Sequence, residues 1–164
     1  MARELKRARI VAMSSPRRQL KLPDDLPPLL QILAKMYPVA HIHADYKKEA
    51  LLPQDHYDLL ELLGNMLDNA CKYAGGDIVL TINTYQTQDK QWGWQIRVCD
   101  LGPGIPQALR EHLLQRGTRL DEHSVQGNGL GLAIVSDIVE SYAGELTLSA
   151  NVPRGLSVRV RLPQ

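Results

Sequence analysis

The chain has 164 residues, which fits one domain of about 150 residues with a short appendage. Lys and Arg number 19 and Asp and Glu 18, so the formal net charge of +1 argues against a general nucleic-acid binder, which is strongly basic. Two cysteines are too few for a disulfide framework or a zinc site, and they favour a reducing, cytoplasmic setting. No apolar stretch approaches the roughly 18 residues of a membrane span.

The first half of the chain contains a basic segment, then a short helix, a strand and a long helix. Residues 1–21 are basic and are interpreted either as a solvated tail or as the end of a preceding domain's helix with its linker. Prolines lead into a predicted helix over residues 29–36, and alternation predicts a strand over 39–45. A longer helix is expected over 53–73, because leucines recur at three- and four-residue steps after Pro53 in the first turn.

The second half alternates between short strands and helices. Gly75 and Gly76 end the long helix. The elements expected after them, in chain order, are strands over 78–83 and 94–98, a weak helix over 107–115, an irregular loop over 116–127, a helix over 130–142 and strands over 146–148 and 156–162. Helices gathered on one face of a largely antiparallel sheet satisfy this order, which predicts an α/β (α+β) fold.

A polar stripe follows one edge of the long predicted helix. Its members recur at steps of three and four and therefore share a face: Glu61, Asn65, Asn69 and Lys72. Such a stripe is ordinarily the solvated side of an amphipathic helix, yet two asparagines one turn apart weaken a helix interior. Their amide oxygens suit magnesium, and Lys72 beside them is able to meet a phosphate.

A second motif lies at the end of the strand predicted over 94–98. Asp100 is followed by Gly102 and Gly104, and this spacing by itself indicates either a simple tight turn or a binding site. A carboxylate at a strand end accepts a hydrogen bond from an exocyclic amine. Neighbouring glycines let a flat ring approach the backbone.

A third motif precedes the helix predicted over 130–142. Gly127, Gly129 and Gly131 offer free backbone amides at a helix N-terminus, which favours an anion site. The dinucleotide-binding fingerprint is excluded, because that motif follows a strand within a βαβ unit. A Walker phosphate loop is also excluded, since no Gly-Lys-Ser/Thr follows.

In this order the three motifs resemble the N, G1 and G2 boxes of the ATP-binding domain of sensor histidine kinases. That domain belongs to the Bergerat-fold (GHKL) superfamily, shared with gyrase, the MutL proteins and the heat-shock chaperone ATPases. The resemblance covers about residues 26–162, and residues 64–73 are similar to the PhoQ-like branch. It implies a two-layer sandwich in which a mixed, largely antiparallel sheet of about five strands packs against three helices. It also implies ATP and Mg²⁺ as cofactors.

The resemblance further implies a role for each motif position. Asn65 and Asn69 would hold magnesium, and Lys72 would contact phosphate. Tyr73 would cover the adenine, and Asp100 would accept its amino group. The positions implied to shape the pocket or hold the triphosphate are Gly102, Gly104, Gly127, Asn128, Gly129, Gly131 and Leu132. Two arginines of the irregular loop are implied to close over the phosphates as a lid: Arg116 and Arg119.

The implied domain organisation is a catalytic domain over residues 22–164, preceded over 1–21 by the remnant of a dimerisation and phosphoacceptor helix with its linker. The implied activity is transfer of the γ-phosphoryl group of ATP to a histidine that this chain lacks. No histidine here is followed by the acidic residue and Leu-Arg-like run of a phosphoacceptor. The enzyme would be incomplete without its phosphoacceptor domain.

The implied partners are ATP, the protein's own dimerisation domain and a cognate response regulator, without nucleic acid. The fragment is expected to be monomeric. Its parent is expected to be a homodimer in the bacterial inner membrane, with this domain on the cytoplasmic side. Two alternatives stay open: a nucleotide-binding regulatory module without transfer activity, and an ATPase of the gyrase or chaperone kind. Asn65 argues against the ATPase, because its counterpart there is a Glu and an amide cannot take a proton from water.

Overall fold

The computed structural model describes residues 18–114 and 129–164. Its elements follow one another as β1 (Gln19–Lys21), α2 (Leu22–Met36), β2 (His41–Tyr46), β3 (Leu51–Asp55), α3 (His56–Ala74), β4 (Asp77–Gln86), β5 (Trp92–Asp100), α4 (Gln107–Leu114), α5 (Gly129–Ser141), β6 (Glu145–Ala150) and β7 (Leu156–Pro163). None of the helices in these two segments combines the length and the apolar character needed to cross a membrane.

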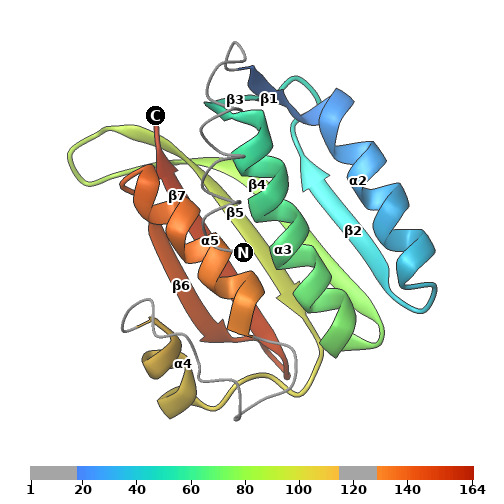
Figure 1. The fold of residues 1–164 in the computed structure, drawn as a ribbon. Helices are drawn as coiled ribbons and strands as arrows, with labels where there is room; N and C mark the ends of the chain where they lie inside the picture. Colours follow the sequence, from blue (N-terminus) through green and yellow to red (C-terminus); the bar gives the residue numbers. More distant parts are fainter. Residues whose placement is uncertain (1–17, 115–128) are drawn as a thin grey trace, which may run out of the picture.

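Five strands form the main sheet, in the order β2-β4-β5-β7-β6. Within the described segments β2 runs parallel to β4, and each of the other neighbouring pairs is antiparallel. Helices α2, α3 and α5 cover one face of this sheet, and α4 lies beyond its end, near β6 (Figure 1). The predicted two-layer α/β fold, with a largely antiparallel sheet and three packed helices, is therefore confirmed.

The core lies between the sheet and the three helices. Alternate residues of β4 point towards the helices, and Ile78, Leu80 and Ile82 are all buried. The apolar stripe of α3 meets them with Leu59, Leu63 and other side chains that are fully buried. A core without phenylalanine is thus built mainly from Leu, Ile, Val and Met, and its position leaves the polar edge of α3 free to face a site.

Helix α2 starts seven residues before the predicted helix over 29–36. Proline occupies its first turn, where the missing N–H has no intrahelical partner in any case, and Pro27 and Pro28 lie further inside. Leu22 and Leu26 are both buried in the core, and this packing keeps the proline-rich segment helical. The prediction was too short because it treated each proline as a helix boundary.

The prediction that Pro53 lies in the first turn of the long helix is wrong. Pro53 belongs to β3, which pairs with β1 in a separate two-stranded sheet. Helix α3 begins at His56, since Oδ1 of Asp55 accepts the backbone N–H of Tyr57 at 2.9 Å and that of Asp58 at 3.4 Å. The predicted end is confirmed, because Gly75 caps the helix in the left-handed conformation.

The short strand β1 lies just before the predicted domain boundary at residue 22. It pairs antiparallel with β3, and its central residue Leu20 is fully buried. Residues 19–21 therefore pack with the folded domain, and the assignment of 1–21 to a preceding helix and linker stays a prediction.

Candidate functional site

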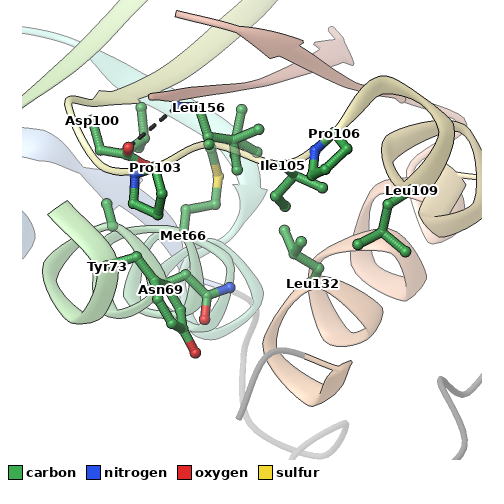
Figure 2. Close-up of a pocket in the computed structure, with 14 residues that line it drawn as sticks. Met66, Asn69, Tyr73, Asp100, Pro103, Ile105, Pro106, Leu109, Leu132 and Leu156 are labelled. Carbon is green, nitrogen blue, oxygen red and sulfur yellow. Dashed lines mark hydrogen bonds between the residues drawn. The ribbon is translucent and has the colours of Figure 1, made fainter. Parts of the chain in front are cut away.

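A cavity of about 250 Å³ opens between α3, α5 and the segment that joins β5 to α4 (Figure 2). Its lining comes from all three sequence motifs and from the sheet: Met66, Asn69, Ala70, Tyr73, Val98, Asp100, Pro103, Gly104, Ile105, Pro106, Leu109, Leu132, Leu156 and Val158. Most of these side chains are apolar, and Asp100 is the one carboxylate among them. A largely apolar cavity with few polar groups suits an aromatic ligand that is oriented by one or two hydrogen bonds.

Asp100 is the last residue of β5 and is only 6% exposed. Its Oδ1 accepts two backbone amides, from Gly102 at 2.9 Å and from Leu156 at 3.2 Å (Figure 2). In residues 18–114 and 129–164, no hydrogen bond is formed to Oδ2. One carboxylate oxygen thus fixes the side chain, and the other remains available to a donor in the cavity.

The glycines after Asp100 permit close backbone contacts that a side chain would prevent. A Cβ on Gly102 would lie 2.6 Å from the carbonyl oxygen of Tyr73, at the end of α3. Gly104 has φ +73°, and a Cβ there would lie 2.9 Å from the carbonyl oxygen of Gly155. The two predicted glycine positions therefore hold the wall of the cavity against both α3 and the β6–β7 connection.

The β6–β7 connection supplies site residues that sequence analysis missed. Asn151 Nδ2 donates to the carbonyl oxygen of Asp100 at 2.8 Å. Gly155 has φ +105°, and a Cβ there would lie 1.9 Å from that same oxygen. A glycine between two alternating strands does signal a turn. Its contact with Asp100, however, depends on the long-range pairing of β5 with β7.

The asparagines of α3 meet the first turn of α5. A Cβ on Gly131 would lie 3.2 Å from Oδ1 of Asn69 and 3.3 Å from Oδ1 of Asn65, so both amide oxygens approach one point. Asn65 Nδ2 also donates to the carbonyl oxygen of Glu61 at 2.8 Å. The structure thus joins the first and third motifs, as predicted.

Two amide oxygens one turn apart on α3, both directed at the first turn of α5, fit a magnesium ion that takes its other ligands elsewhere. Amide carbonyls are among the hard oxygen donors that magnesium accepts, and this ion usually keeps waters and substrate phosphates in its shell. In the described segments no group of three or more His, Cys, Asp and Glu residues is placed to hold a metal ion. A magnesium ion at Asn65 and Asn69 would therefore complete its shell with water or with oxygens of a bound molecule.

Lys72 does not line the cavity in this structure. Its Nζ lies 2.6 Å from Oδ2 of Asp68, one helical turn back. Tyr37, at the end of α2, donates its hydroxyl to Oδ1 of the same carboxylate at 2.5 Å. The hydrogen bond to Asp68 raises the pKa of Lys72, and burial together with this carboxylate raises the pKa of Tyr37 to about 12. Lys72 is thus held as a cation beside the cavity, directed at Asp68.

The other predicted positions fall into two groups. Leu132 lines the cavity, Tyr73 lies beside Asn69 in its wall, and Gly129 is the first residue of α5. The remaining four lie outside the described residues: Arg116, Arg119, Gly127 and Asn128.

Residues 54–164 match the protein family described as histidine kinase-, DNA gyrase B- and HSP90-like ATPases. The chain belongs to this family. Among relatives within it, the sensor protein kinase CarS of Pseudomonas aeruginosa is 40% identical over 164 residues, which is 99% of this chain and 36% of CarS. The two-component sensor PhoQ of the same organism is 33% identical over 144 residues, which is 84% of this chain and 31% of PhoQ. The chain thus spans about a third of the length of these curated relatives.

Solved structures agree with this family assignment. The mycobacterial sensor histidine kinase MprB superposes with a TM-score of 0.71 at 25% identity, over 90% of this chain and 97% of that one. The catalytic domain of the histidine kinase ThkA gives a TM-score of 0.71 at 18% identity, over 91% of this chain and 96% of that one, and it supports the fold alone. The predicted resemblance to the ATP-binding domain of sensor histidine kinases is confirmed by both kinds of comparison.

Proposed function

We propose that this chain binds ATP and Mg²⁺ and transfers the γ-phosphoryl group to a histidine on the dimerisation domain of a two-component sensor kinase. The observation that carries the proposal is Asp100, a buried carboxylate with one oxygen fixed by two amides and the other without a donor among the described residues. Adenine offers an amino group as a donor, whereas guanine carries a carbonyl oxygen at the corresponding ring position. Asp100 therefore favours ATP over GTP.

The phosphates of ATP would extend from the cavity towards α5. Asn65 and Asn69 would hold the magnesium ion, whose charge offsets that of the phosphates. The amides of Gly129 and Gly131 lie in the first turn of α5, where a helix favours negative charge. Lys72 would reach a phosphate after leaving Asp68. Four positions outside the described residues would complete this end: Arg116 and Arg119 of the predicted lid, and Gly127 and Asn128 of the third motif.

Within residues 18–114 and 129–164, no base is placed beside Asn65 and Asn69 to activate water, and such an arrangement would preserve bound ATP for transfer. Asn65 occupies the position at which ATPases of the superfamily carry a glutamate, and an amide does not accept a proton from water. The side chain of Glu61 is one turn away, is exposed and does not line the cavity. In the transfer itself, a histidine nitrogen would form a bond to the γ-phosphorus while the bond to the ADP oxygen breaks.

An Asn65→Glu variant tests this account of slow hydrolysis. We expect ATP hydrolysis to increase by about 10²-fold in steady-state assays, because the variant supplies the missing general base. Asn83→Glu is the matched control, since Asn83 is exposed on β4 and should leave the rate unchanged. A wild-type rate equal to that of Asn65→Glu would contradict the account.

Calorimetric titration with ATP, ADP, GTP and adenosine, with and without magnesium, tests the binding step. We expect the adenine nucleotides to bind and GTP to bind much more weakly. Magnesium should strengthen the binding of ATP more than the binding of adenosine. Absence of binding heat with every adenine nucleotide, for a protein shown to be folded, would overturn the proposal.

A transfer assay separates the kinase from a regulatory nucleotide-binding module. The chain is mixed with labelled ATP and a separately expressed, histidine-bearing dimerisation domain of the parent protein. We expect label on the wild-type domain and none on its His→Ala variant. ATP binding without labelling would support the regulatory module instead.

The same proposal places the chain in a larger assembly. The full-length parent would be a homodimer in the bacterial inner membrane, with this domain on the cytoplasmic side, and its phosphohistidine would serve a cognate response regulator. The relatives CarS and PhoQ, named as a sensor kinase and a two-component sensor, support this assignment.

A further inference from the structure

The face of the main sheet that points away from the helices carries two arginines in direct opposition. Arg97 of β5 and Arg159 of β7 are register partners in the antiparallel pair. Their neighbours Val98 and Val160 are buried on the helix side, so alternation puts both arginines on the open face. Like charges placed directly opposite each other destabilise a sheet, and this arrangement calls for a compensating negative charge.

Among the described residues, no carboxylate lines the hollow that this pair borders, and none forms an ion pair with either arginine. The two arginines border a hollow of about 260 Å³ on β5, β7 and β6, whose lining is Gln95, Arg97, Thr147, Ser149, Ser157 and Arg159. The members other than the arginines are uncharged side chains that can form hydrogen bonds. The hollow is therefore positive and rich in donors.

The guanidinium groups also have unused donors. Arg97 Nε donates to Ser157 Oγ at 2.9 Å, and Arg159 Nη2 makes a long contact of 3.4 Å to Thr147 Oγ1. Arg159 Nε is buried and has no hydrogen-bond acceptor within residues 18–114 and 129–164. A buried charged donor without an acceptor is costly, and an anion in the hollow would supply one.

Arg161, on the same face, has both hydrogen-bond and charge partners. It lies two residues along β7, where its Nε donates to Gln95 Oε1 at 2.9 Å. Its Nη1 lies 3.9 Å from Glu145, and its guanidinium carbon lies 5.0 Å from the ring centroid of Tyr85. Arg161 thus has a carboxylate and an aromatic ring nearby, in contrast to the arginines of the hollow.

We propose that this hollow binds the phosphate group of a small molecule between Arg97 and Arg159. The planar guanidinium fork matches the oxygens of a phosphate, and two forks neutralise a dianion better than one. The site is separate from the Asp100 cavity and does not rest on the proposed function. The two sites nevertheless share β7, since Val158 lines the cavity while Ser157 and Arg159 line the hollow.

The test titrates the full chain with inorganic phosphate, against sodium chloride at equal ionic strength, and follows backbone amides by NMR. We expect saturable shifts over residues 145–149 and 157–161. Arg159→Gln should weaken this binding by at least about tenfold, since it removes charge-assisted hydrogen bonds. Arg161→Gln removes the same charge from the same face. If direct contact with the phosphate determines the affinity, and not long-range attraction, this variant should change the affinity by less than about twofold.

Three control experiments accompany this titration. Arg97→Gln repeats the test should Arg159→Gln fail to fold. Asp100→Asn should retain the shifts over 145–149 and 157–161, which separates the hollow from the cavity. Acetate replaces phosphate in a parallel titration and should bind more weakly. The proposal is overturned by the absence of phosphate-specific shifts, by equal losses in Arg159→Gln and Arg161→Gln, by shifts confined to the cavity, or by an equal response to acetate.

Discussion

The two ends of the Asp100 cavity are built in different ways. At one end Asp100 is already fixed by its neighbours: two backbone amides donate to Oδ1, and the Asn151 side chain donates to its carbonyl oxygen. At the other end, polar side chains of α3 are engaged with neighbours on the same helix. Asn65 donates to the Glu61 carbonyl, and Lys72 is paired with Asp68. The first end is therefore already arranged without a ligand, whereas Asn65 and Lys72 at the second end would have to exchange partners in order to bind one.

This difference assigns separate tasks to the two ends. Groups fixed in advance lose little freedom on binding, so in the proposed function the Asp100 end would give base specificity at low entropic cost. The α3 end spends part of its interaction energy on breaking existing contacts, which makes its contribution depend on magnesium and phosphate. Adenosine therefore reports on the first end alone, and ATP reports on both.

Gly155→Ala should have the largest effect, because it displaces the backbone that holds Asp100. A Cβ would lie 1.9 Å from the Asp100 carbonyl oxygen at a residue with φ +105°. We expect a loss of about 3 kcal/mol in the free energy of unfolding, measured by urea denaturation. The affinities for adenosine and for ATP should fall by the same factor. Gly76→Ala is the control, since its Cβ would meet no atom within 4 Å; equal midpoints for the two variants would refute the rigid-turn account.

Asp100→Asn should come next, and it acts on binding with little effect on the fold. The amide oxygen can still accept the backbone N–H of Gly102 and of Leu156, whereas the amide nitrogen would present a donor to the ligand's amino group. We expect both adenosine and ATP to weaken by about 30-fold in calorimetry, which corresponds to about 2 kcal/mol. Asp77→Asn, on the exposed sheet face, should change neither. Unchanged affinity in Asp100→Asn would remove the base-recognition role.

Local patterns in the sequence were sufficient for most of the fold. Alternation in β4 and β7 and the leucine periodicity of α3 reflect burial on one side, which each segment records by itself. Strands β1 and β3 were missed, since each is short and the latter contains Pro53. The early start of α2 was missed because packing of Leu22 and Leu26, and not local propensity, keeps the segment helical.

The site shows the same division. Asp100, Asn69 and the glycines were predicted because each motif carries its chemistry within a few residues. Gly155 and the Tyr37–Asp68 hydrogen bond were not predicted, because they join segments that are 55 and 31 residues apart only after the sheet and helices have packed. The side chains proposed to bind the ligand are visible in a local pattern, whereas the contacts that hold them in place depend on tertiary structure.

Gly131→Ala should separate the two ends of the cavity. A Cβ there would press on both asparagines, at 3.0 Å from Asn69 Nδ2 and 3.3 Å from Asn65 Oδ1. We expect affinity for magnesium–ATP to fall by about tenfold, or about 1.4 kcal/mol, with adenosine unchanged. Gly64→Ala in α3 is the control, because its nearest atom would be Leu29 Cδ1 at 3.8 Å. Equal losses for ATP and adenosine in Gly131→Ala would show that the ends are not independent.

Tyr37→Phe should give the smallest effect, and it asks whether the Asp68 contact matters to the phosphate end. The pKa of Tyr37 is raised to about 12 by burial and by Asp68, so its stabilisation is complete below pH 10 and is lost as the pH rises towards 12. Burial and Asp58 raise the pKa of Tyr142 to about 12 as well, at the opposite end of α3. In both Tyr→Phe variants, thermal stability should therefore fall less steeply than in the wild type as the pH rises from 10 towards 12.

Only Tyr37→Phe should also alter magnesium–ATP affinity, because only Tyr37 shares Asp68 with Lys72. Removing its hydroxyl leaves Asp68 bound more firmly to Lys72, which makes transfer of the lysine to a phosphate harder. We expect ATP to weaken by about twofold to threefold in calorimetry, or about 0.5 kcal/mol, while adenosine stays unchanged. If Tyr142→Phe weakens ATP by the same factor, the effect comes from general loosening of α3, and Asp68 has no particular influence on the phosphate end.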